Sequence, residues 1–299
     1  MNELGYNDMG HLTDELLTHL LRPVPGTALP WWPVMNQAIG GLRSGELTLI
    51  CAPTGTGKTQ LLANIACQLM EQRTPTFIAP VETGAVDFMA RMVSVLDRYD
   101  YNTGEPQSAE VVRSMQEKHF PAIKAAGFKF GNYESRVEIE EMKTMLIYQT
   151  QLYGMKVALL DNLNFFLKVT RSQDQILEMD EAVRVFGQVA KQMNIHIILV
   201  CHPKKTDGGR VTSEFDLKGS SSLVQEAWNV GLWNRPPTED PRPVTDRELV
   251  FRKMRRRGSV VGQAFWFRYV GGRFIESTQT QQPKPFSQNR KPGYKHEYL

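Results

Sequence analysis

The apolar positions of this chain follow two patterns that alternate along the sequence. Short continuous apolar runs without a polar face are typical of strands buried on both sides of a parallel sheet, and we expect such strands within residues 45–53, 74–82, 128–131, 155–163 and 195–202. The longer segments between them have apolar residues at helical spacing, which predicts helices within residues 58–72, 84–99, 108–126, 136–152 and 173–193. This alternation predicts an α/β core in which helices flank a mainly parallel sheet.

The two ends of the chain differ from this core. Three further strand-like runs with few helical signals, at residues 228–235, 247–254 and 263–270, predict an extension of the sheet by antiparallel strands. Five leucines lie on one face of an amphipathic helix expected within residues 9–21, which packs either on its own core or on a neighbouring subunit: Leu12, Leu16, Leu17, Leu20 and Leu21. We therefore expect a linker arm at 1–29, one domain at 30–276 and a disordered basic tail at 277–299.

Composition and charge change this picture in two respects. The 299 residues, of which 41% are hydrophobic, suit one large domain, and the formal charge is only +3. However, 13 Lys and Arg against 4 Asp and Glu follow from Arg242 onward, so we expect the C-terminal part to meet phosphates. The three cysteines are far apart and are expected to be reduced core residues. No apolar run is long enough to cross a bilayer and no signal peptide begins the chain, which predicts a cytoplasmic protein, or a phage protein in its host's cytoplasm.

The segment "CAPTGTGKTQ" lies between a predicted strand and a predicted helix. Its glycines let backbone N–H groups and the helix N-terminus face a polyphosphate, where Lys58 reaches the β- and γ-phosphates of ATP and the Thr59 hydroxyl ligates Mg²⁺. Ala52 replaces the first glycine of the usual pattern, but the strand–turn–helix context remains. The predicted nucleotide-binding residues are Ala52, Pro53, Thr54, Gly55, Thr56, Gly57, Lys58, Thr59 and Gln60.

Two acidic residues at strand ends complete the predicted chemistry. Asp161 closes a buried run and would supply the carboxylate on the Mg²⁺ side, although such a residue can also be a helix or turn cap. Glu82 ends the predicted strand beside the loop and would act on the attacking water, with an exposed surface glutamate as the alternative.

Several segments together resemble the RecA-like hexameric helicases of the DnaB type, which include phage replicative helicases and the mitochondrial helicase Twinkle. "VETGAVDFMARM" is similar to the family's catalytic-glutamate segment, "LLDNLNFF" to its Walker B strand, "VCHPKK" to its sensor motif and "DLKGSSSLVQEAWNVGLWNR" to its DNA-contact motif. The resemblance extends from about residue 30 to 276. It implies a RecA-like P-loop NTPase core.

The resemblance also implies roles for single residues. Glu82 would be the general base and His202 the sensor of the γ-phosphate, although a histidine at a strand end is more often an ordinary one. Arg235, at the end of the DNA-contact motif, is expected to bind the nucleotide. The residues expected to contact DNA are Lys204, Lys205, Arg210, Lys218, Gly219 and Ser220. A solvated basic loop is the alternative for them.

A basic segment near the C-terminus resembles the family's Lys-x-Arg pair, which reaches into the neighbouring subunit's ATP site. Lys253 and Arg255 match that spacing, and Arg255 would be the finger that acts in trans. The sequence departs from the family pattern because Arg256 and Arg257 crowd the segment and one extra residue precedes Gly262. The finger can therefore be displaced to Arg256 or Arg257, and a solvated charge run is the other alternative.

These observations predict an ATP- and Mg²⁺-dependent DNA helicase that forms a ring, translocates on single-stranded DNA and unwinds forked duplex during replication. The resemblance implies a hexamer, 5′ to 3′ movement and a separate primase or polymerase as a further partner. A recombination ATPase that forms filaments on single strands is the first alternative, since head-to-tail interfaces form either rings or filaments. A packaging or remodelling ATPase without unwinding activity is the second.

Overall fold

The structure is a computed structural model that describes residues 12–13, 16–17, 25–102, 105–133, 136–167, 172–203, 209–213, 216 and 221–277. Of the predicted N-terminal helix only residues 12–13 and 16–17 are described; they are helical, and Leu12, Leu16 and Leu17 are exposed. The predicted tail lies outside the described residues, apart from Ser277. In the described part of the chain, no helix combines the length and apolar character that crossing a membrane requires.

Nine strands form one sheet within the described residues, in the order β3-β2-β4-β5-β1-β6-β7-β8-β9. Their bounds are β1 Leu47–Cys51, β2 Thr76–Pro80, β3 Lys129–Phe130, β4 Val157–Asp161, β5 His196–Cys201, β6 Asn229–Asn234, β7 Arg247–Met254, β8 Ala264–Val270 and β9 Arg273–Glu276. The strands β1 to β6 are parallel to one another, and β7 to β9 extend the sheet from β6 in antiparallel order. The predicted mixed α/β sheet is therefore confirmed.

Two details of the sheet differ from the sequence prediction. The run at 228–235 was expected to begin the antiparallel extension, but β6 pairs in parallel with β1, with Leu49 opposite Val230. The apolar run of β6 does not show its direction, because β6 is buried throughout while it pairs in parallel with β1 and antiparallel with β7. The short strand β9 follows a turn at Gly271 and Gly272 and was not predicted.

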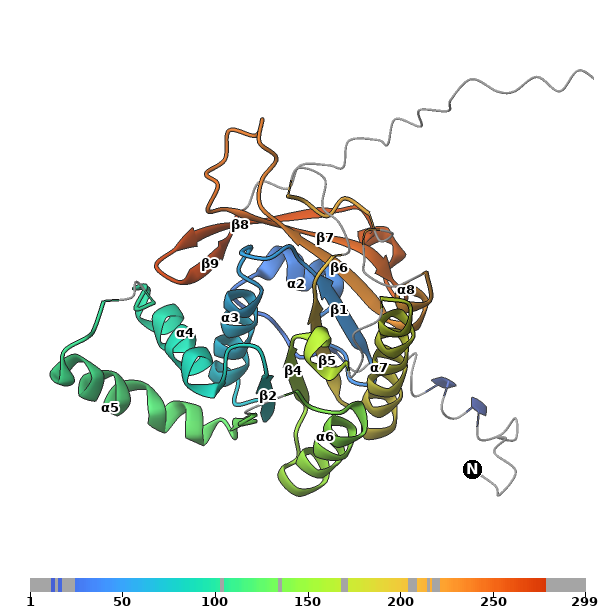
Figure 1. The fold of residues 1–299 in the computed structure, drawn as a ribbon, viewed down its shortest axis with the longest axis horizontal. Helices are drawn as coiled ribbons and strands as arrows, with labels where there is room; N and C mark the ends of the chain where they lie inside the picture. Colours follow the sequence, from blue (N-terminus) through green and yellow to red (C-terminus); the bar gives the residue numbers. More distant parts are fainter. Residues whose placement is uncertain are drawn as a thin grey trace, which may run out of the picture.

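Helices cover both faces of the parallel part of the sheet (Figure 1). The helices and 3₁₀ turns are α2 Pro33–Ile39, α3 Lys58–Glu71, α4 Ala85–Asp97, α5 Ala109–Ala125, α6 Ile139–Tyr153, η1 Leu163–Phe166, α7 Ser172–Met193, α8 Ser221–Glu226 and η3 Gly258–Val260. Side chains from α3, α4 and α5 share one apolar core with α2 and the C-terminal strands, whereas α6, α7 and α8 share the other. Alternate strand residues enter opposite cores, as Leu49 and Ile50 of β1 do.

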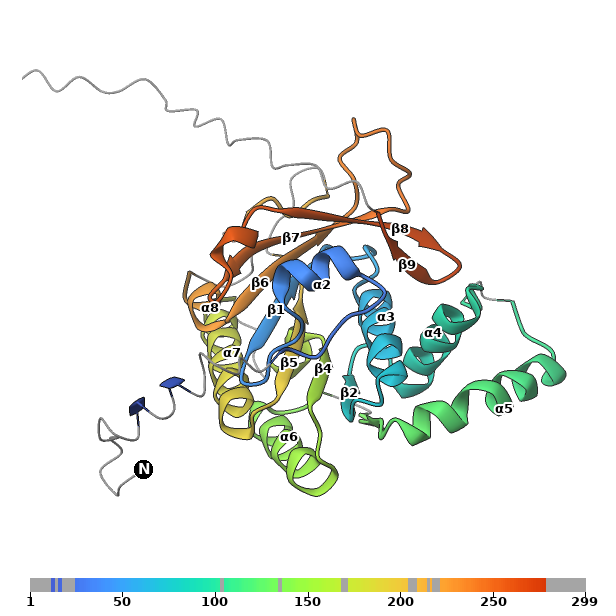
Figure 2. The same cartoon turned by 180° about the vertical axis from the view of Figure 1, so that it is seen from behind.

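The C-terminal strands are attached to the helix that follows the glycine-rich loop. Asn64 of α3, which is fully buried, donates to the Gly272 carbonyl and accepts from the Phe274 amide at 2.8 Å. The indole of Trp32, just before α2, donates to the Phe274 carbonyl, and Figure 2 shows α2 beside these strands. The antiparallel extension is therefore fixed to the same helix that begins with Lys58, rather than being a separate appendage.

Candidate nucleotide-binding site

Four neighbouring parallel strands end at one edge of the sheet, and each is followed by a predicted site residue. Along β2-β4-β5-β1, these are Glu82 after β2, Asp161 at the end of β4, His202 after β5 and the glycine-rich loop after β1. The register places Pro80 beside Asp161 and Cys51 beside Cys201, so the four strands end at nearly the same level. Ligands of open α/β sheets bind at the carboxyl ends of the strands, and this edge is therefore the candidate site.

Side chains from β6, β7 and the segment after β6 donate hydrogen bonds to carbonyls of the glycine-rich loop. Gly55 and Gly57 have positive φ angles of 74° and 83°, which only glycine adopts readily. The Thr56 carbonyl accepts from the Trp233 indole at 3.0 Å and from Arg247 Nε at 2.6 Å, and Arg235 donates to the Gly55 carbonyl at 2.8 Å. These bonds turn loop carbonyls toward the protein, which leaves the opposite side of the loop for an anion.

Lys58 begins α3 and lies almost buried beneath the loop. Its ammonium donates to the Ala52 and Pro53 carbonyls at 3.3 and 3.2 Å, and it is 3.1 Å from His202 Nδ1. Burial lowers the pKa of Lys58, whereas the charges of Glu82 and Asp161 oppose that shift. A buried cation with only neutral hydrogen-bond acceptors is a favourable partner for phosphate oxygens.

Asp161 and Thr59 form the candidate magnesium position. The Thr59 hydroxyl donates to Asp161 Oδ2 at 2.5 Å, while Asp161 Oδ1 is buried and has no hydrogen-bond partner among the described residues. Burial raises the pKa of Asp161 to about 6. A buried carboxylate oxygen without a partner beside a hydroxyl is a suitable donor set for a hard divalent cation, so these residues fit Mg²⁺. The turn-cap alternative for Asp161 finds no support in these contacts.

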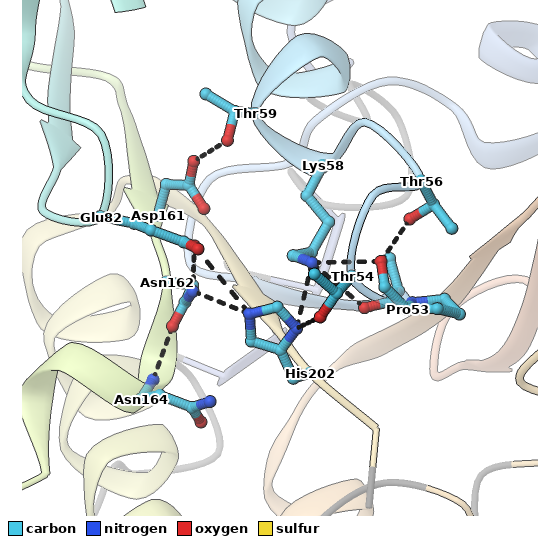
Figure 3. A network of polar contacts seen from close by, with 11 residues as sticks. Pro53, Thr54, Thr56, Lys58, Thr59, Glu82, Asp161, Asn162, Asn164 and His202 are labelled. Carbon is cyan, nitrogen blue, oxygen red and sulfur yellow. Dashed lines mark hydrogen bonds and ion pairs between the residues drawn. The ribbon is translucent and has the colours of Figure 1, made fainter. Parts of the chain in front are cut away.

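Glu82, Asn162 and His202 form a polar chain next to this pair (Figure 3). The Asn162 side-chain amide donates to the Glu82 carboxylate and lies 3.2 Å from His202 Nε2. The other ring nitrogen, Nδ1, faces Lys58 and the Thr54 hydroxyl at 3.3 Å. Glu82 is exposed at this edge, and its carboxylate accepts from Asn162; its role as the general base stays a prediction.

An open cavity of about 830 Å³ adjoins the loop. Loop residues, His202 and Arg210 line one part of it, and the segment after β6, including Arg235 and Asp240, lines another. Its volume lies in the range of pockets that hold small ligands. The predicted nucleotide residue Arg235 therefore lies at both the loop and the cavity.

Gln60 is the predicted loop residue whose side chain points elsewhere. Its amide nitrogen donates to the Gly272 carbonyl at 2.7 Å, and its oxygen accepts from Arg91 at 3.4 Å. Gln60 thereby attaches α3 to the β8–β9 turn. A nucleotide contact by its side chain therefore stays a prediction.

The basic segment at the end of β7 contacts the C-terminal end of α8. Lys253 donates to the Val224 and Gln225 carbonyls at 2.6 and 2.7 Å, and Arg255 donates to the Gln225 carbonyl at 2.6 Å. Both side chains thus reach the same side, as the Lys-x-Arg spacing predicts. Burial, and then the charge of Arg255, lower the pKa of Lys253 to about 8. Arg255 also lies over the Trp228 ring.

The two extra arginines differ from each other in their contacts. Arg256 pairs with the buried Glu46 at 2.8 Å, whereas Arg257 donates to the Gln37 and Ala38 carbonyls of α2. A buried carboxylate holds its partner more firmly than a carbonyl at a helix end does. The trans-acting finger stays a prediction; these contacts favour Arg255 over Arg256 for that role, whereas Arg257, which like Arg255 contacts carbonyls near a helix end, stays an alternative.

The predicted DNA contacts are described only in part. Lys204, Lys205, Lys218, Gly219 and Ser220 lie outside the described residues. Arg210 is described, and its guanidinium forms an ion pair with Glu248 of β7 at the edge of the cavity. Arg210 as a DNA contact therefore stays a prediction that requires this ion pair to open.

Three residues of the site were not predicted from the sequence. Asn162 joins Glu82 to His202, and Trp233 and Arg247 support the loop through the Thr56 carbonyl. Asn162 directly follows the candidate magnesium ligand Asp161, and this position was the only available signal for it. The other two depend on how β6 and β7 pass under the loop, which no local pattern shows.

Two curated proteins of phages are similar to this chain. The Gene 65 protein of Mycobacterium phage L5 is 25% identical over 202 residues, which cover 66% of this chain and 73% of that protein. The DNA helicase/primase of Enterobacteria phage T3 is 24% identical over 206 residues, which cover 64% of this chain. The match spans only 35% of the phage T3 protein's length.

Solved structures show the same fold at low sequence identity. A DnaB-like replicative helicase, described with its interactions with primase, matches 90% of this chain and 67% of its own, with a TM-score of 0.69 at 13% identity. The ATPase domain of G40P matches 90% and 99%, with the same score and identity. A KaiC-like protein of Pyrococcus horikoshii matches 85% and 100%, with a TM-score of 0.60 at 16% identity. These likenesses confirm the RecA-like α/β fold.

The model of the DnaB-like helicase C-terminal domain matches residues 32–275. That range includes the loop, the four strand ends and the antiparallel extension that supports them. The resemblance inferred from the sequence segments is therefore confirmed over most of the chain. The chain belongs to the family of DnaB-like helicase C-terminal domains.

Proposed function

We propose that this chain is the ATPase motor of a ring-forming replicative DNA helicase. The observation that carries the proposal is the meeting of Lys58, Asp161, Glu82 and His202 at one sheet edge in a chain of the DnaB-like family. A phosphate-binding cation, a metal-side carboxylate, a base and a polar sensor are the groups that nucleotide hydrolysis requires. Each comes from the end of a different parallel strand, which fixes their relative positions.

Hydrolysis assigns a separate task to each of these residues. Lys58 and the loop N–H groups bind the β- and γ-phosphates of ATP, and Thr59 with Asp161 holds Mg²⁺, which neutralises phosphate charge. Glu82 accepts a proton from the attacking water, which adds to the γ-phosphorus as the bond to the β-phosphate oxygen breaks. His202 lies beside Lys58 and contacts the γ-phosphate, so it distinguishes ATP from ADP.

The proposed assembly is a hexameric ring with each nucleotide site at a subunit interface. Lys253 and Arg255 end on the surface at the C-terminus of α8, from which they would reach the neighbour's γ-phosphate. A guanidinium in that position contributes on the order of 10³- to 10⁵-fold in rate in other phosphoryl-transfer enzymes. Such an interface is head-to-tail and closes into a ring or continues as a filament.

The proposed substrate is single-stranded DNA in the channel of the ring, with forked duplex ahead of it. The basic residues 204, 205, 210 and 218 would contact phosphates there, and the proposed direction of movement is 5′ to 3′. One structurally similar helicase is described together with primase, and the phage T3 relative is itself a helicase/primase. A primase, or a polymerase, is therefore the proposed partner of this motor.

ATP turnover together with particle images tests this proposal against its alternatives. We expect hydrolysis that single-stranded DNA stimulates, and closed rings in negative-stain images with ATP and Mg²⁺. The Lys58→Ala variant should lack turnover and serves as the control for contaminating ATPases. Filaments on single strands would favour the recombination ATPase. Stimulated turnover without any unwinding would favour a packaging or remodelling ATPase.

A further inference from the structure

The side chain of Asn162 is fixed in one orientation by the turn that follows it. Its Oδ1 accepts from the Asn164 backbone N–H at 2.9 Å, which caps the start of η1, and the residue is fully buried. An amide with its oxygen bound in this way must turn its nitrogen to the opposite side. That nitrogen carries two hydrogens, and it faces the Glu82 carboxylate and His202 Nε2.

The ring of His202 is faced by hydrogen-bond donors on both sides. The Asn162 amide lies 3.2 Å from Nε2, closer than the Glu82 carboxylate at 3.9 Å, and the Lys58 ammonium lies 3.1 Å from Nδ1. A neutral imidazole has one lone pair to accept with, so it cannot satisfy both donors at once. Lys58 has other acceptors in the Ala52 and Pro53 carbonyls, and the phosphates of a bound nucleotide would be still better ones. Asn162 is held in place by its cap.

We propose that Asn162 is a positioning residue that sets the tautomer of His202 and holds Glu82 with the same amide group. When Lys58 turns to the phosphates, Nε2 accepts from Asn162 and the proton resides on Nδ1, on the loop side of the ring. The Nδ1–H group then donates to a γ-phosphate oxygen. The second amide hydrogen fixes the Glu82 carboxylate. This inference rests on the proposed ATP hydrolysis at this site.

Two substitutions separate this role from the capping role. Asn162→Ser keeps a good N-cap acceptor for the Asn164 amide but has only one donor hydrogen, so it cannot donate to Glu82 and His202 together. Asn162→Asp keeps the shape and the cap acceptor but offers His202 an acceptor instead of a donor, which requires the proton on Nε2. Asn164→Ala is the matched control, because the backbone N–H at 164 still donates the cap bond to Asn162 and the Asn164 side chain is not part of the chain of contacts in Figure 3 from Glu82 to His202.

Nitrogen-15 NMR of histidine-labelled protein reads the tautomer directly. The chain has six histidines, and His202→Gln identifies the signal of interest. With a non-hydrolysable ATP analogue and Mg²⁺, we expect the Nδ1–H form in the wild type and in Asn164→Ala. We expect the Nε2–H form in Asn162→Asp. In Asn162→Ser we expect that the Nδ1–H form is no longer the only one present. A wild-type signal in the Nε2–H form would overturn the proposal.

Steady-state kinetics and nucleotide binding complete the test. We expect kcat of Asn162→Ser to fall about 10- to 100-fold, as for other residues that orient a reacting group through a hydrogen bond, with little change in ATP affinity. Asn164→Ala should keep the wild-type kcat. An unchanged kcat in Asn162→Ser, or an equal fall in Asn164→Ala, overturns the inference but leaves the ATPase intact. Absence of nucleotide binding by the wild type would overturn the proposed function itself.

Discussion

Acidification should weaken the fold through one buried histidine. His196 begins β5 and is 2% exposed. Its Nδ1–H donates to the Arg43 carbonyl at 2.7 Å, and its Nε2 accepts from the Thr48 hydroxyl at 3.0 Å. That hydroxyl also accepts from Asn229 at 3.1 Å, so the neutral ring is fully satisfied. A proton added at Nε2 would bring a second donor and an unpaired charge into this core.

The size of the effect follows from the pKa of His196. Burial lowers this pKa to about 4, from an ordinary value of about 6.5 in the unfolded chain. Between these values the unfolded state binds more protons than the folded state, so the free energy of unfolding falls as the pH falls. In this window the free energy of unfolding falls by about 1.4 kcal/mol per pH unit. The total loss is about 2 kcal/mol at pH 5 and about 3 kcal/mol below pH 4.

Urea unfolding at pH 7 and pH 5 measures this contribution. His196→Gln removes the titrating ring and keeps a polar side chain. The wild type and the variant therefore have all their remaining carboxylates and histidines in common. We expect the wild type to lose about 2 kcal/mol more than the variant between these pH values, at equal protein concentration. Equal losses in the two proteins would show that His196 is not held neutral by its surroundings.

Three further predictions concern the nucleotide site and the DNA loops. Lys58→Ala should lose hydrolysis because the β- and γ-phosphates lose their cation. Glu82→Gln should bind a fluorescent ATP analogue but not hydrolyse it. Loss of binding in Glu82→Gln would indicate a structural role for Glu82. Arg255→Ala mixed with Glu82→Gln should regain some hydrolysis, because a mixed ring contains pockets with both groups intact; activity of Arg255→Ala alone would move the finger to one of the next two arginines. Neutralising Lys204 or Lys205 should reduce the salt dependence of single-strand binding by nearly one unit, and an unchanged slope would remove that residue from the channel.

The parallel core was predictable because the burial of its strands is visible in the local sequence pattern. The strands β1, β2, β4 and β5 are fully buried, so each appears as a continuous apolar run in the sequence. The strand β9 is only four residues long and follows two glycines, and α2 is a single short helix after two tryptophans. Their formation depends on contacts such as Trp32 with Phe274, 242 residues apart in the chain, which no local pattern carries.

The candidate site was predictable to the extent that its chemistry lies in local motifs. Lys58 and Thr59 follow from the loop, and Asp161 and Glu82 follow from their positions at strand ends. The bond between Asn162 and Glu82 spans 80 positions and exists because β2 and β4 are neighbours. The support of Thr56 by Trp233 likewise spans 177 positions. Strand order, which the sequence does not state, decides both contacts.

Strand displacement on forked duplexes measures the proposed helicase activity itself. The substrate set consists of DNA forks with a 5′ tail, a 3′ tail or both, and the matching RNA forks, with ATP and Mg²⁺. We expect ATP-dependent separation of DNA forks that carry a 5′ tail, and no separation by Lys58→Ala. If the wild type separates no fork while it hydrolyses ATP in the presence of single-stranded DNA, the chain is not the motor of a replicative helicase.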